Sequence, residues 1–429
     1  MPRQLDTIHT SRLALWLSWP SILGEFAPCA LLGDDARQLP LSAWPEPDRR
    51  ITDLRQPFHE SVRACMADHA VVGVSVSGGL DSLAVLIEAA RIAEQDGRRV
   101  VATIAEMTDD AGLSNVPTVQ RLVTVADLRN VELHISATTD SPVSDLAWCD
   151  EGPGLDALPL ANLRLAEIAA DHGATVMLGG NGADELLGAV RYLFDSFIRS
   201  GDVRAFQSYW SDTIGTYRDA YKAELLAMMS RLLPPKCRAF SYFASEWPEL
   251  SRSPVPDILG TEHRTHVSAR SADWVASSIG HHARNHASWA TMAAWDAVFP
   301  LHILSGSGPI PLVHPFLTPQ FVAAAQRSPL TRRYDPQFPH AYWRQKAQVL
   351  ALIPEYVRVA LPIAKQTYRA ELSSRYLTDK IDAFILAALG VVDKETWEQT
   401  TDELLINRVN KLELWIRAAI ARGYSMAHD

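Results

Sequence analysis

The fold is decided by the stretch Val71-Val72-Gly73-Val74-Ser75-Val76-Ser77-Gly78-Gly79-Leu80-Asp81-Ser82. A short apolar run, typical of a buried strand, meets a Ser-Gly-Gly-x-Asp-Ser turn, and apolar residues then recur at helical spacing over 83–92. Glycines let the main chain approach a ligand closely, and the first turn of a helix presents unpaired N–H groups and the positive end of a dipole. The stretch therefore predicts an anion site between a strand and a helix.

An acidic residue, Asp81, stands inside this turn and would repel a bare phosphate. Mg²⁺ in proteins commonly combines one or two carboxylates with phosphate oxygens, so the pattern predicts a site for pyrophosphate and Mg²⁺. The hydroxyls of Ser77 and Ser82 add donors. No Gly-Lys-Ser/Thr follows the glycines, and their spacing differs from that of the dinucleotide fingerprint. The simpler alternative is a glycine turn that only joins strand to helix.

Length and composition indicate an ordinary globular protein of two or three domains. The 429 residues are 47% hydrophobic and 21% charged, and 40 basic against 50 acidic residues give a net charge of −10. An acidic balance argues against a nonspecific nucleic-acid binder. The four cysteines are widely scattered, and no apolar run is long enough to span a bilayer. We therefore expect a cytoplasmic protein without a membrane or nucleic-acid partner.

Strand and helix patterns alternate after the glycine turn. The expected strands are 71–76, 100–105, 131–136 and 175–178, and the expected helices of this part are 55–67, 117–128 and 160–172. This alternation predicts an α/β fold, with a parallel sheet and helices on both faces. In such sheets ligands bind at the carboxyl ends of the strands, where the glycine turn lies.

The strand pattern stops near residue 190, and long helical tracts follow, including 203–229 and 404–421. The chain is thus expected to comprise a short N-terminal segment (1–55), an ATP-binding α/β core (56–195) and a mostly helical, substrate-binding part (196–429).

A second glycine-rich turn follows the fourth expected strand, with the sequence Gly179-Gly180-Asn181-Gly182-Ala183-Asp184-Glu185-Leu186-Leu187-Gly188. Acidic residues favour helix starts through the helix dipole, which is the structural explanation for Asp184. Its placement after a parallel strand suggests a functional role as well, because Asp184 could face the same cation as Asp81. The main chain of Gly179 and Gly180 could approach the nucleotide.

The two glycine turns together resemble the synthetase domain of asparagine synthetases, members of the PP-loop ATP pyrophosphatases. Relatives include β-lactam synthetases and lasso-peptide cyclases. The resemblance extends over about 55–375. Weaker matches are Asp150-Glu151-Gly152-Pro153, Pro315-Phe316-Leu317, Arg344 with Ala347, and Leu361-Pro362-Ile363-Ala364-Lys365-Gln366.

The resemblance implies a PP-loop fold of the adenine nucleotide α-hydrolase type. It also implies an ATP-dependent reaction: a substrate carboxylate is adenylated, pyrophosphate leaves, and an amine then displaces AMP. Asp81 and Asp184 would hold Mg²⁺, and the catalytic residues would be Lys365, Asn181 and Asp184, with Lys365 stabilising developing charge. The implied nucleotide contacts are Ser77, Gly78, Gly79, Asp81 and Ser82 for pyrophosphate, and Val76, Ile104, Gly179 and Gly180 for adenosine.

The chain departs from glutamine-dependent relatives in ways that bear on the amine. Pro2 stands where they have cysteine, and 55 residues are too few for a glutaminase domain, so we expect none. Asn181 stands where asparagine synthetases have glutamate, and an amide cannot act as a general base. Pro311, Val313 and Thr318 also replace family residues, which argues against aspartate as substrate.

These observations favour an ATP-dependent amide synthetase, with macrolactam closure on a peptide as its leading version. Its partners would be a carboxylate substrate such as a precursor peptide, an amine nucleophile, and a partner protease or peptide-binding protein. The alternatives are an ammonia-dependent asparagine synthetase and a nucleotide-binding partner subunit without turnover.

Histidines and tryptophans cluster between 263 and 295. His282 and His286 lie four residues apart, which could place two metal ligands on one helical face, but no supporting glutamate accompanies them. We expect solvated or capping histidines here, and tryptophans that pack a helical core.

Overall fold

A computed structural model describes most of the chain. The described residues are 7–18, 53–137, 159–188, 191–216, 220–247, 255–298, 308–373, 379–382 and 384–427. The weak match at Asp150-Glu151-Gly152-Pro153 lies outside them.

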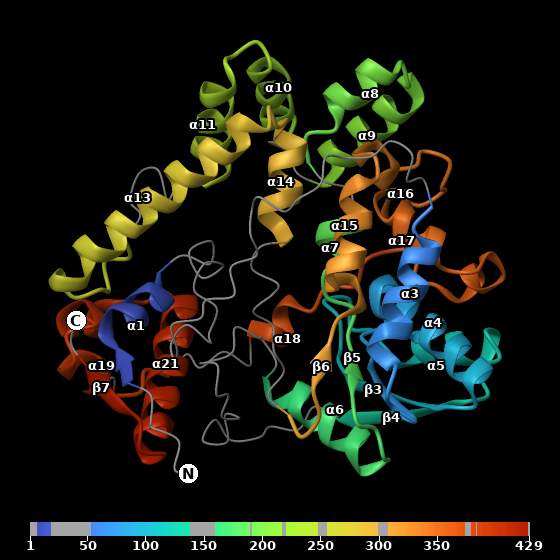
Figure 1. Cartoon of the computed structure of the whole chain (residues 1–429), viewed down its shortest axis with the longest axis horizontal. Coiled ribbons are helices and arrows are strands. Elements are labelled where there is room, and N and C mark those ends of the chain that lie inside the picture. Colours follow the sequence, from blue (N-terminus) through green and yellow to red (C-terminus); the bar gives the residue numbers. More distant parts are fainter. Residues whose placement is uncertain are drawn as a thin grey trace.

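The main sheet has five parallel strands in the order β4-β3-β2-β5-β6 (Figure 1). Strand β2 is central, and the order reverses between β2 and β5, so this is the switch point where crevices open in such sheets. The expected α/β parallel sheet is confirmed, and four of its strands were predicted. The strands are β2 (Val71–Ser75), β3 (Arg99–Glu106), β4 (Val131–Ala137), β5 (Met177–Leu178) and β6 (Leu312–Val313).

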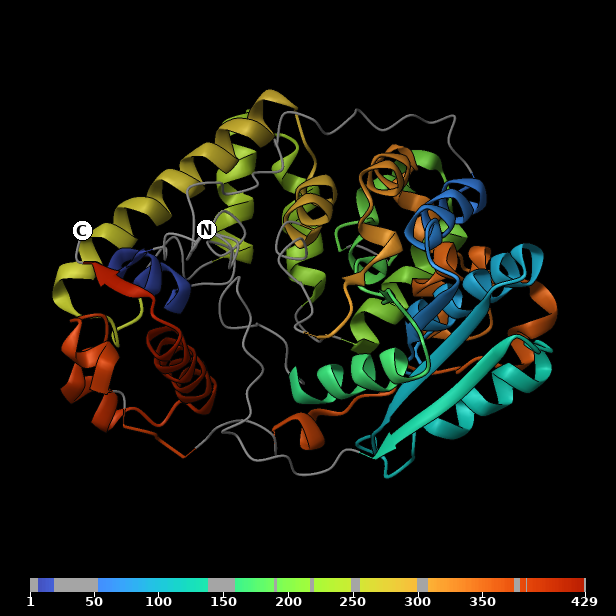
Figure 2. The same cartoon turned by 60° about the horizontal axis from the view of Figure 1, so that its bottom comes forward.

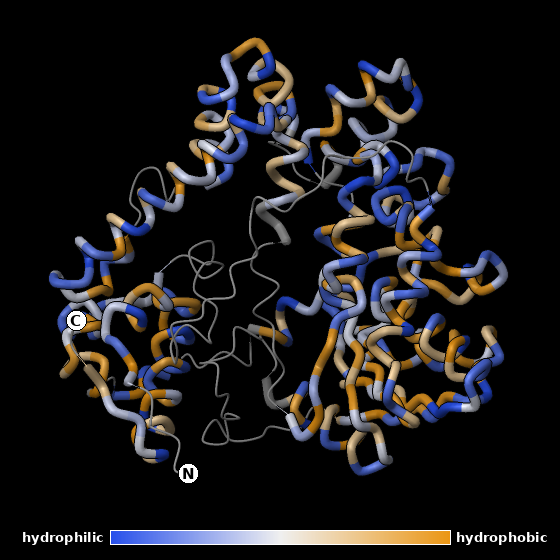
Figure 3. The backbone as a smooth tube through the Cα atoms, viewed as in Figure 1, coloured by the Kyte–Doolittle hydropathy of each residue, from blue (hydrophilic) through white to orange (hydrophobic). Residues whose placement is uncertain are grey.

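Helices cover both faces of the sheet, as the alternating pattern predicts (Figure 2). Alternate strand residues such as Val72, Val74 and Val100 pack with α3, α4 and α5, whereas Val101 and Met177 pack with α6 on the other face. In Figure 3 strands β5 and β6 are coloured hydrophobic; β5 is buried, and edge strand β6 is half-buried. The helices of this part are α3 (Arg55–Met66), α4 (Leu80–Asp96), α5 (Val116–Val125) and α6 (Pro159–Asp171).

The remainder is mostly helical, as expected, and its longest helix, α13, has 24 residues. One group of segments continues the α/β part: α7 (Ala183–Leu187), η5 (Pro315–Leu317), α15 (Pro319–Arg327), η6 (Leu330–Arg333), α16 (Ala341–Gln345), α17 (Ala347–Leu352), η7 (Glu355–Ala360) and α18 (Arg369–Ser373). The others are α8 (Phe194–Ser200), α9 (Val203–Thr216), α10 (Ala220–Ser230), α11 (Pro235–Glu246), α13 (Thr261–Arg284), α14 (Trp289–Val298), α19 (Phe384–Ala388), α20 (Lys394–Gln399) and α21 (Glu403–Ala421).

The aromatic residues of this helical part form its core, and the tryptophan expectation is confirmed by buried Trp274 and Trp289. The histidine expectation is wrong for His281 and His282, which are 7% and 2% exposed. Their rings pack against Trp295 at 4.2 and 5.5 Å. Within the described residues the histidines of this cluster do not form a group of metal ligands.

The two ends of the chain meet in a small second sheet. Strand β1 (Thr7–His9) pairs in parallel with β7 (Ser425–Ala427), and α1 (Thr10–Leu17) packs against α13 and α21 (Figure 1). Residues 7–18 of the predicted N-terminal segment therefore belong to the C-terminal helical part, whereas 53–55 lead into α3. Such short strands carry too little periodicity to be found from sequence. None of the described helices combines the length and apolarity that crossing a membrane requires.

Gly73 of the central strand β2 lies against Met177 of β5 and Ala169 of α6. A Cβ atom at Gly73 would lie 2.7 Å from Sδ of Met177 and 3.1 Å from Cβ of Ala169. We predict that Gly73→Val lowers the free energy of unfolding by about 1–3 kcal/mol through overpacking. Urea denaturation measures it, with Gly73→Ala as the milder comparison. Equal urea midpoints for Gly73→Val and wild type would contradict the close packing of Met177 and Ala169 around Gly73.

Candidate active site

Two loops meet at the carboxyl ends of neighbouring strands. The turn after β2 leads into α4, whose first turn carries Asp81. The turn after β5 contains Gly180 and leads into α7, whose first turn carries Asp184. A Cβ atom at Gly180 would lie 2.8 Å from the main-chain nitrogen of Ser82 and 3.0 Å from its Cα. Only glycine allows this approach, because real Cβ atoms do not come so close to main-chain atoms. The two glycine turns predicted from sequence therefore form one site.

The first turn is held by its own polar groups. Gly78 has a positive φ of 86°, which favours glycine. The main-chain N–H of Ser77 donates to Oγ of Ser82 at 3.1 Å, and that hydroxyl donates to the carbonyl of Gly79 at 3.1 Å. Asn115, which is buried, donates to the carbonyl of Ser77 at 3.3 Å. Gly79 caps α4, so the turn opens directly onto the N–H groups of a 17-residue helix.

The carboxylates of Asp81 and Asp184 converge on one ammonium group. Nζ of Lys346 lies 2.7 Å from both carboxylate oxygens of Asp81 and also contacts Oδ1 of Asp184. Nζ of Lys365 lies 3.5 Å from the other oxygen of Asp184. The side chain of Lys346 is 5% exposed, whereas that of Lys365 is 62% exposed. Two carboxylates thus share a cation at the switch point of the sheet.

Burial and charge act against each other in this cluster. Burial, together with repulsion from Asp184, raises the pKa of Asp81 above its ordinary value although Lys346 acts to lower it. Burial acts in the same sense on Asp184, but Lys346 and Lys365 outweigh it and the pKa of Asp184 is lowered. Burial would lower the pKa of Lys346, yet its two carboxylate partners raise it. Lys346 therefore stays protonated and supplies the positive charge of the pair.

This arrangement fits the expected Mg²⁺. The cation position between Asp81 and Asp184 is taken by the ammonium group of Lys346, which shows that both carboxylates reach one positive ion. Two carboxylates that leave further positions for phosphate oxygens are a donor set that Mg²⁺ prefers. The residues present therefore suit the ion.

A cavity of about 260 Å³ lies beside the two loops. Of the predicted site residues, Ser77, Asp81, Ser82, Gly179, Gly180 and Asn181 line it. The side chains of Val76 and Ile104 instead belong to the hydrophobic core, being 2% and 0% exposed. Neither of these two predicted adenosine contacts lines the cavity.

His314 is a cavity residue that the sequence did not suggest. It directly follows β6, and its ring fills the space beside Gly179, where a Cβ atom would lie 2.6 Å from two ring atoms. Its Nε2 lies 3.5 Å from Nδ2 of Asn181. A lone histidine after a two-residue strand carries no motif, so only its place directly before the Pro-Phe-Leu segment could have drawn attention to it.

Lys346 is the second residue that the sequence did not suggest, although the family resemblance pointed to Arg344 two positions earlier. Arg344 serves the scaffold: its Nη2 and Nε lie 2.7 and 2.8 Å from the carboxylate of Asp212 in α9, which also accepts from Tyr334 at 2.7 Å. The Pro315-Phe316-Leu317 segment is structural as well. Phe316 stacks on Phe58 at 4.8 Å.

The shared ammonium group leads to a stability prediction. Lys346→Met leaves two carboxylates facing each other without their buried counter-cation, so the free energy of unfolding should fall by about 3–5 kcal/mol. Urea denaturation measures it, and the deficit should shrink at acid pH, where the carboxyls take up protons. Exposed Lys394 is the matched control, and Lys394→Met should change stability by less than about 0.5 kcal/mol. The double variant Lys346→Met/Asp81→Asn should be more stable than Lys346→Met alone; additive losses would contradict the shared ion pair.

No curated protein matches the chain. Among solved structures, the chain is similar to the U34-tRNA thiolase NcsA from Methanococcus maripaludis with its 4Fe-4S cluster. The sequence identity is 14%, the match covers 54% of this chain and 77% of that chain, and the TM-score is 0.23. This likeness is too weak to bear on chemistry.

A family model gives the stronger finding. The model described as asparagine synthase matches residues 53–345, which include all five strands of the main sheet, both glycine turns and His314. The match covers well over half of the 429 residues. Both glycine turns of the matched region meet at the carboxyl ends of β2 and β5. On the ground of the family match, the chain belongs to the asparagine synthase family.

Proposed function

We propose that the chain is an ATP-dependent amide-bond-forming synthetase. It would adenylate a substrate carboxylate with release of pyrophosphate, then transfer the acyl group to an amine with release of AMP. The observation that carries this proposal is the convergence of Asp81 and Asp184 on one cation beside the Ser77–Ser82 turn. Membership of the asparagine synthase family supports the reaction class.

The residues around the cavity suggest a division of roles in the first half-reaction. The main-chain N–H groups and hydroxyls of Ser77, Gly78, Gly79 and Ser82 would hold the pyrophosphate end of ATP at the start of α4. Asp81 and Asp184 would hold Mg²⁺, which neutralises polyphosphate charge. Lys365, exposed and adjacent to Asp184, would offset negative charge that develops on the reacting phosphate and acyl groups.

The second half-reaction needs a base. As the amine nitrogen bonds to the acyl carbon, the bond from that carbon to AMP breaks and the amine must lose a proton. The amide of Asn181 cannot accept it. The imidazole of His314, 3.5 Å from that amide, lies in the same cavity and is a residue type suited to the task. We therefore assign the proton transfer to His314.

The substrate of our leading version is a peptide that carries both reacting groups, so that the product is a macrolactam. Four substitutions support this version: Asn181 replaces the family glutamate, and Pro311, Val313 and Thr318 replace residues of the aspartate-using pattern. Ammonia-dependent asparagine synthesis is the competing version. Aspartate with ammonium, offered beside peptide carboxylates with amines, separates the two.

The adenylation step predicts equal release of pyrophosphate and AMP from ATP in the presence of an accepted carboxylate and amine. Asp81→Asn, Asp184→Asn and Lys365→Met should each lower carboxylate-dependent ATP–pyrophosphate exchange by at least about 100-fold, since each removes charge that acts on the phosphates. Exposed Asp68 and Lys394 provide matched controls, Asp68→Asn and Lys394→Met, with wild-type exchange expected. Release of ADP and phosphate instead of AMP and pyrophosphate would overturn the mechanism.

The proton transfer has its own prediction. His314→Asn should keep ATP–pyrophosphate exchange near the wild-type rate while the rate of amide formation falls by about 10²–10⁴-fold, the usual contribution of a general base. Exposed His266 of α13 provides the control His266→Asn. Parallel loss of both half-reactions would indicate that His314 only shapes the loop at Gly179, and unchanged amide formation would exclude it as the base.

A further inference from the structure

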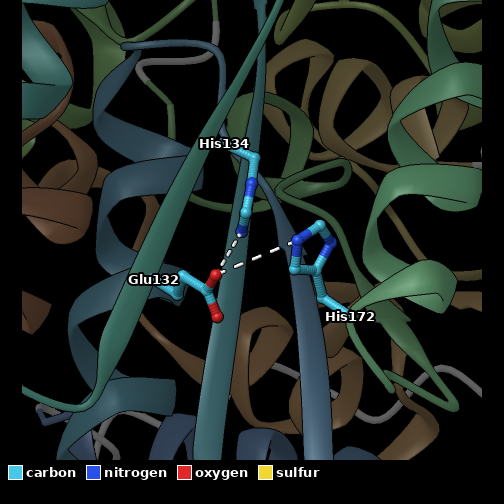
Figure 4. Close-up of side chains that lie close together, drawn as sticks. All are labelled: Glu132, His134 and His172. Carbon is cyan, nitrogen blue, oxygen red and sulfur yellow. Dashed lines mark ion pairs between the residues drawn. The ribbon is translucent and has the colours of Figure 1, made fainter.

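Three side chains converge on the surface of the sheet's edge strand, away from the cavity (Figure 4). Glu132 and His134 point from the same face of β4, and His172 follows the end of α6. Oε1 of Glu132 lies 2.9 Å from Nε2 of His134 and 3.9 Å from Nε2 of His172. The ligand atoms of all three residues lie within 4.8 Å of one another. The two imidazole rings are 3.8 Å apart between centroids.

The two histidines are oriented as metal ligands are. Nδ1 of His172 lies 2.8 Å from the carbonyl of Ile168 and donates to it, so the lone pair of the ring belongs to Nε2, which faces Glu132. Such a hydrogen bond from the second ring nitrogen to a carbonyl accompanies most metal-binding histidines. Nε2 of His134 is buried and, among the described residues, makes no hydrogen bond of acceptable geometry. A metal ion would satisfy it.

Arg99 supports the cluster from the neighbouring strand. Its Nη1 lies 3.9 Å from Oε2 of Glu132, and its Nη2 donates to the carbonyl of His172 at 3.4 Å. The arginine thus lies beside the outer carboxylate oxygen and hydrogen-bonds to the main chain that carries His172. Oε1 of Glu132 is left facing the two imidazoles.

We propose that Glu132, His134 and His172 form a binding site for a divalent transition metal of the Zn²⁺ type. Zn–N and Zn–O bonds of about 2.0–2.2 Å place tetrahedral ligand atoms about 3.3–3.6 Å apart, and the measured 2.9 and 3.9 Å bracket this separation. Two imidazoles and one carboxylate are ligands that suit Zn²⁺. Water would complete the coordination, because the three side chains are 23–49% exposed.

The site lies at the opposite end of the strands from the nucleotide loops. Glu132 is the second residue of β4, and His172 precedes β5, whereas the glycine turns follow the carboxyl ends of β2 and β5. The role that follows from this place is structural. A metal would link edge strand β4, which pairs only with β3 in the described sheet, to the connection between α6 and β5.

The test is a titration of the metal-free full chain with Zn²⁺ by calorimetry, with Co²⁺ absorption as the spectroscopic readout of coordination. We expect one ion per chain and a higher melting temperature with Zn²⁺. His134→Ala, His172→Ala and Glu132→Gln should each weaken binding by more than the roughly 10–100-fold that losing an outer-shell partner costs. Far-UV circular dichroism and ATP–pyrophosphate exchange check that the variants fold.

His59 provides the matched control, because its Nδ1 lies 2.6 Å from Oε1 of Glu88 without a second histidine in the group. His59→Asn should leave Zn²⁺ affinity and Co²⁺ absorption unchanged. Stoichiometric binding that survives His134→Ala and His172→Ala, or absence of stoichiometric binding to the wild type, would overturn the proposal. Neither outcome depends on the reaction that the nucleotide loops support.

Discussion

The close approach of Gly180 to the main chain of Ser82 is the constraint on which the site depends. Strands β2 and β5 are neighbours although about a hundred residues separate them, and their turns meet because no side chain stands between them. This contact brings Asp81 and Asp184 to one point. The strand order of the parallel sheet reverses between β2 and β5, and ligands bind in the crevice at such a reversal. The sheet topology and the close approach at Gly180 therefore place the site at the same point.

The charge cluster then explains why the site tolerates two carboxylates in a half-buried place. Unpaired, Asp81 and Asp184 would repel each other and lose hydration. Lys346 balances both at once, and the more exposed Lys365 forms an ion pair with Asp184. The scaffold stabilises this arrangement from outside: buried Arg333 donates to the carbonyl of Glu185 at 2.9 Å and so holds α7, the helix that carries Asp184.

Sequence reasoning predicts features that local patterns encode. The strand–turn–helix at Ser77–Ser82, its counterpart at Asp184 and four strands of the sheet follow from periodicity and glycine placement. Strand β6, Lys346 and His314 do not, because a two-residue strand has no period and a single lysine or histidine has no pattern. Their roles arise from contacts between distant segments, such as Lys346 with Asp81, 265 positions apart. Likewise Glu132, His134 and His172 become a group only after α6 folds onto the sheet.

The two halves of the cavity carry different chemical demands. In the proposed reaction the half formed by the Ser77–Ser82 turn and Asp184 would hold phosphates with fixed charges and main-chain N–H groups. Few residue types can do this, so the sequence pattern is recognisable. In the proposed reaction the other half would bind the amine and accept its proton, and there Nδ2 of Asn181 lies 3.5 Å from Nε2 of His314. A neutral amide beside an imidazole leaves less negative charge in that half than a carboxylate would. Under the proposed function, this half would therefore favour the neutral, reactive form of the amine over its protonated form, since a cation there would gain no counter-charge from Asn181.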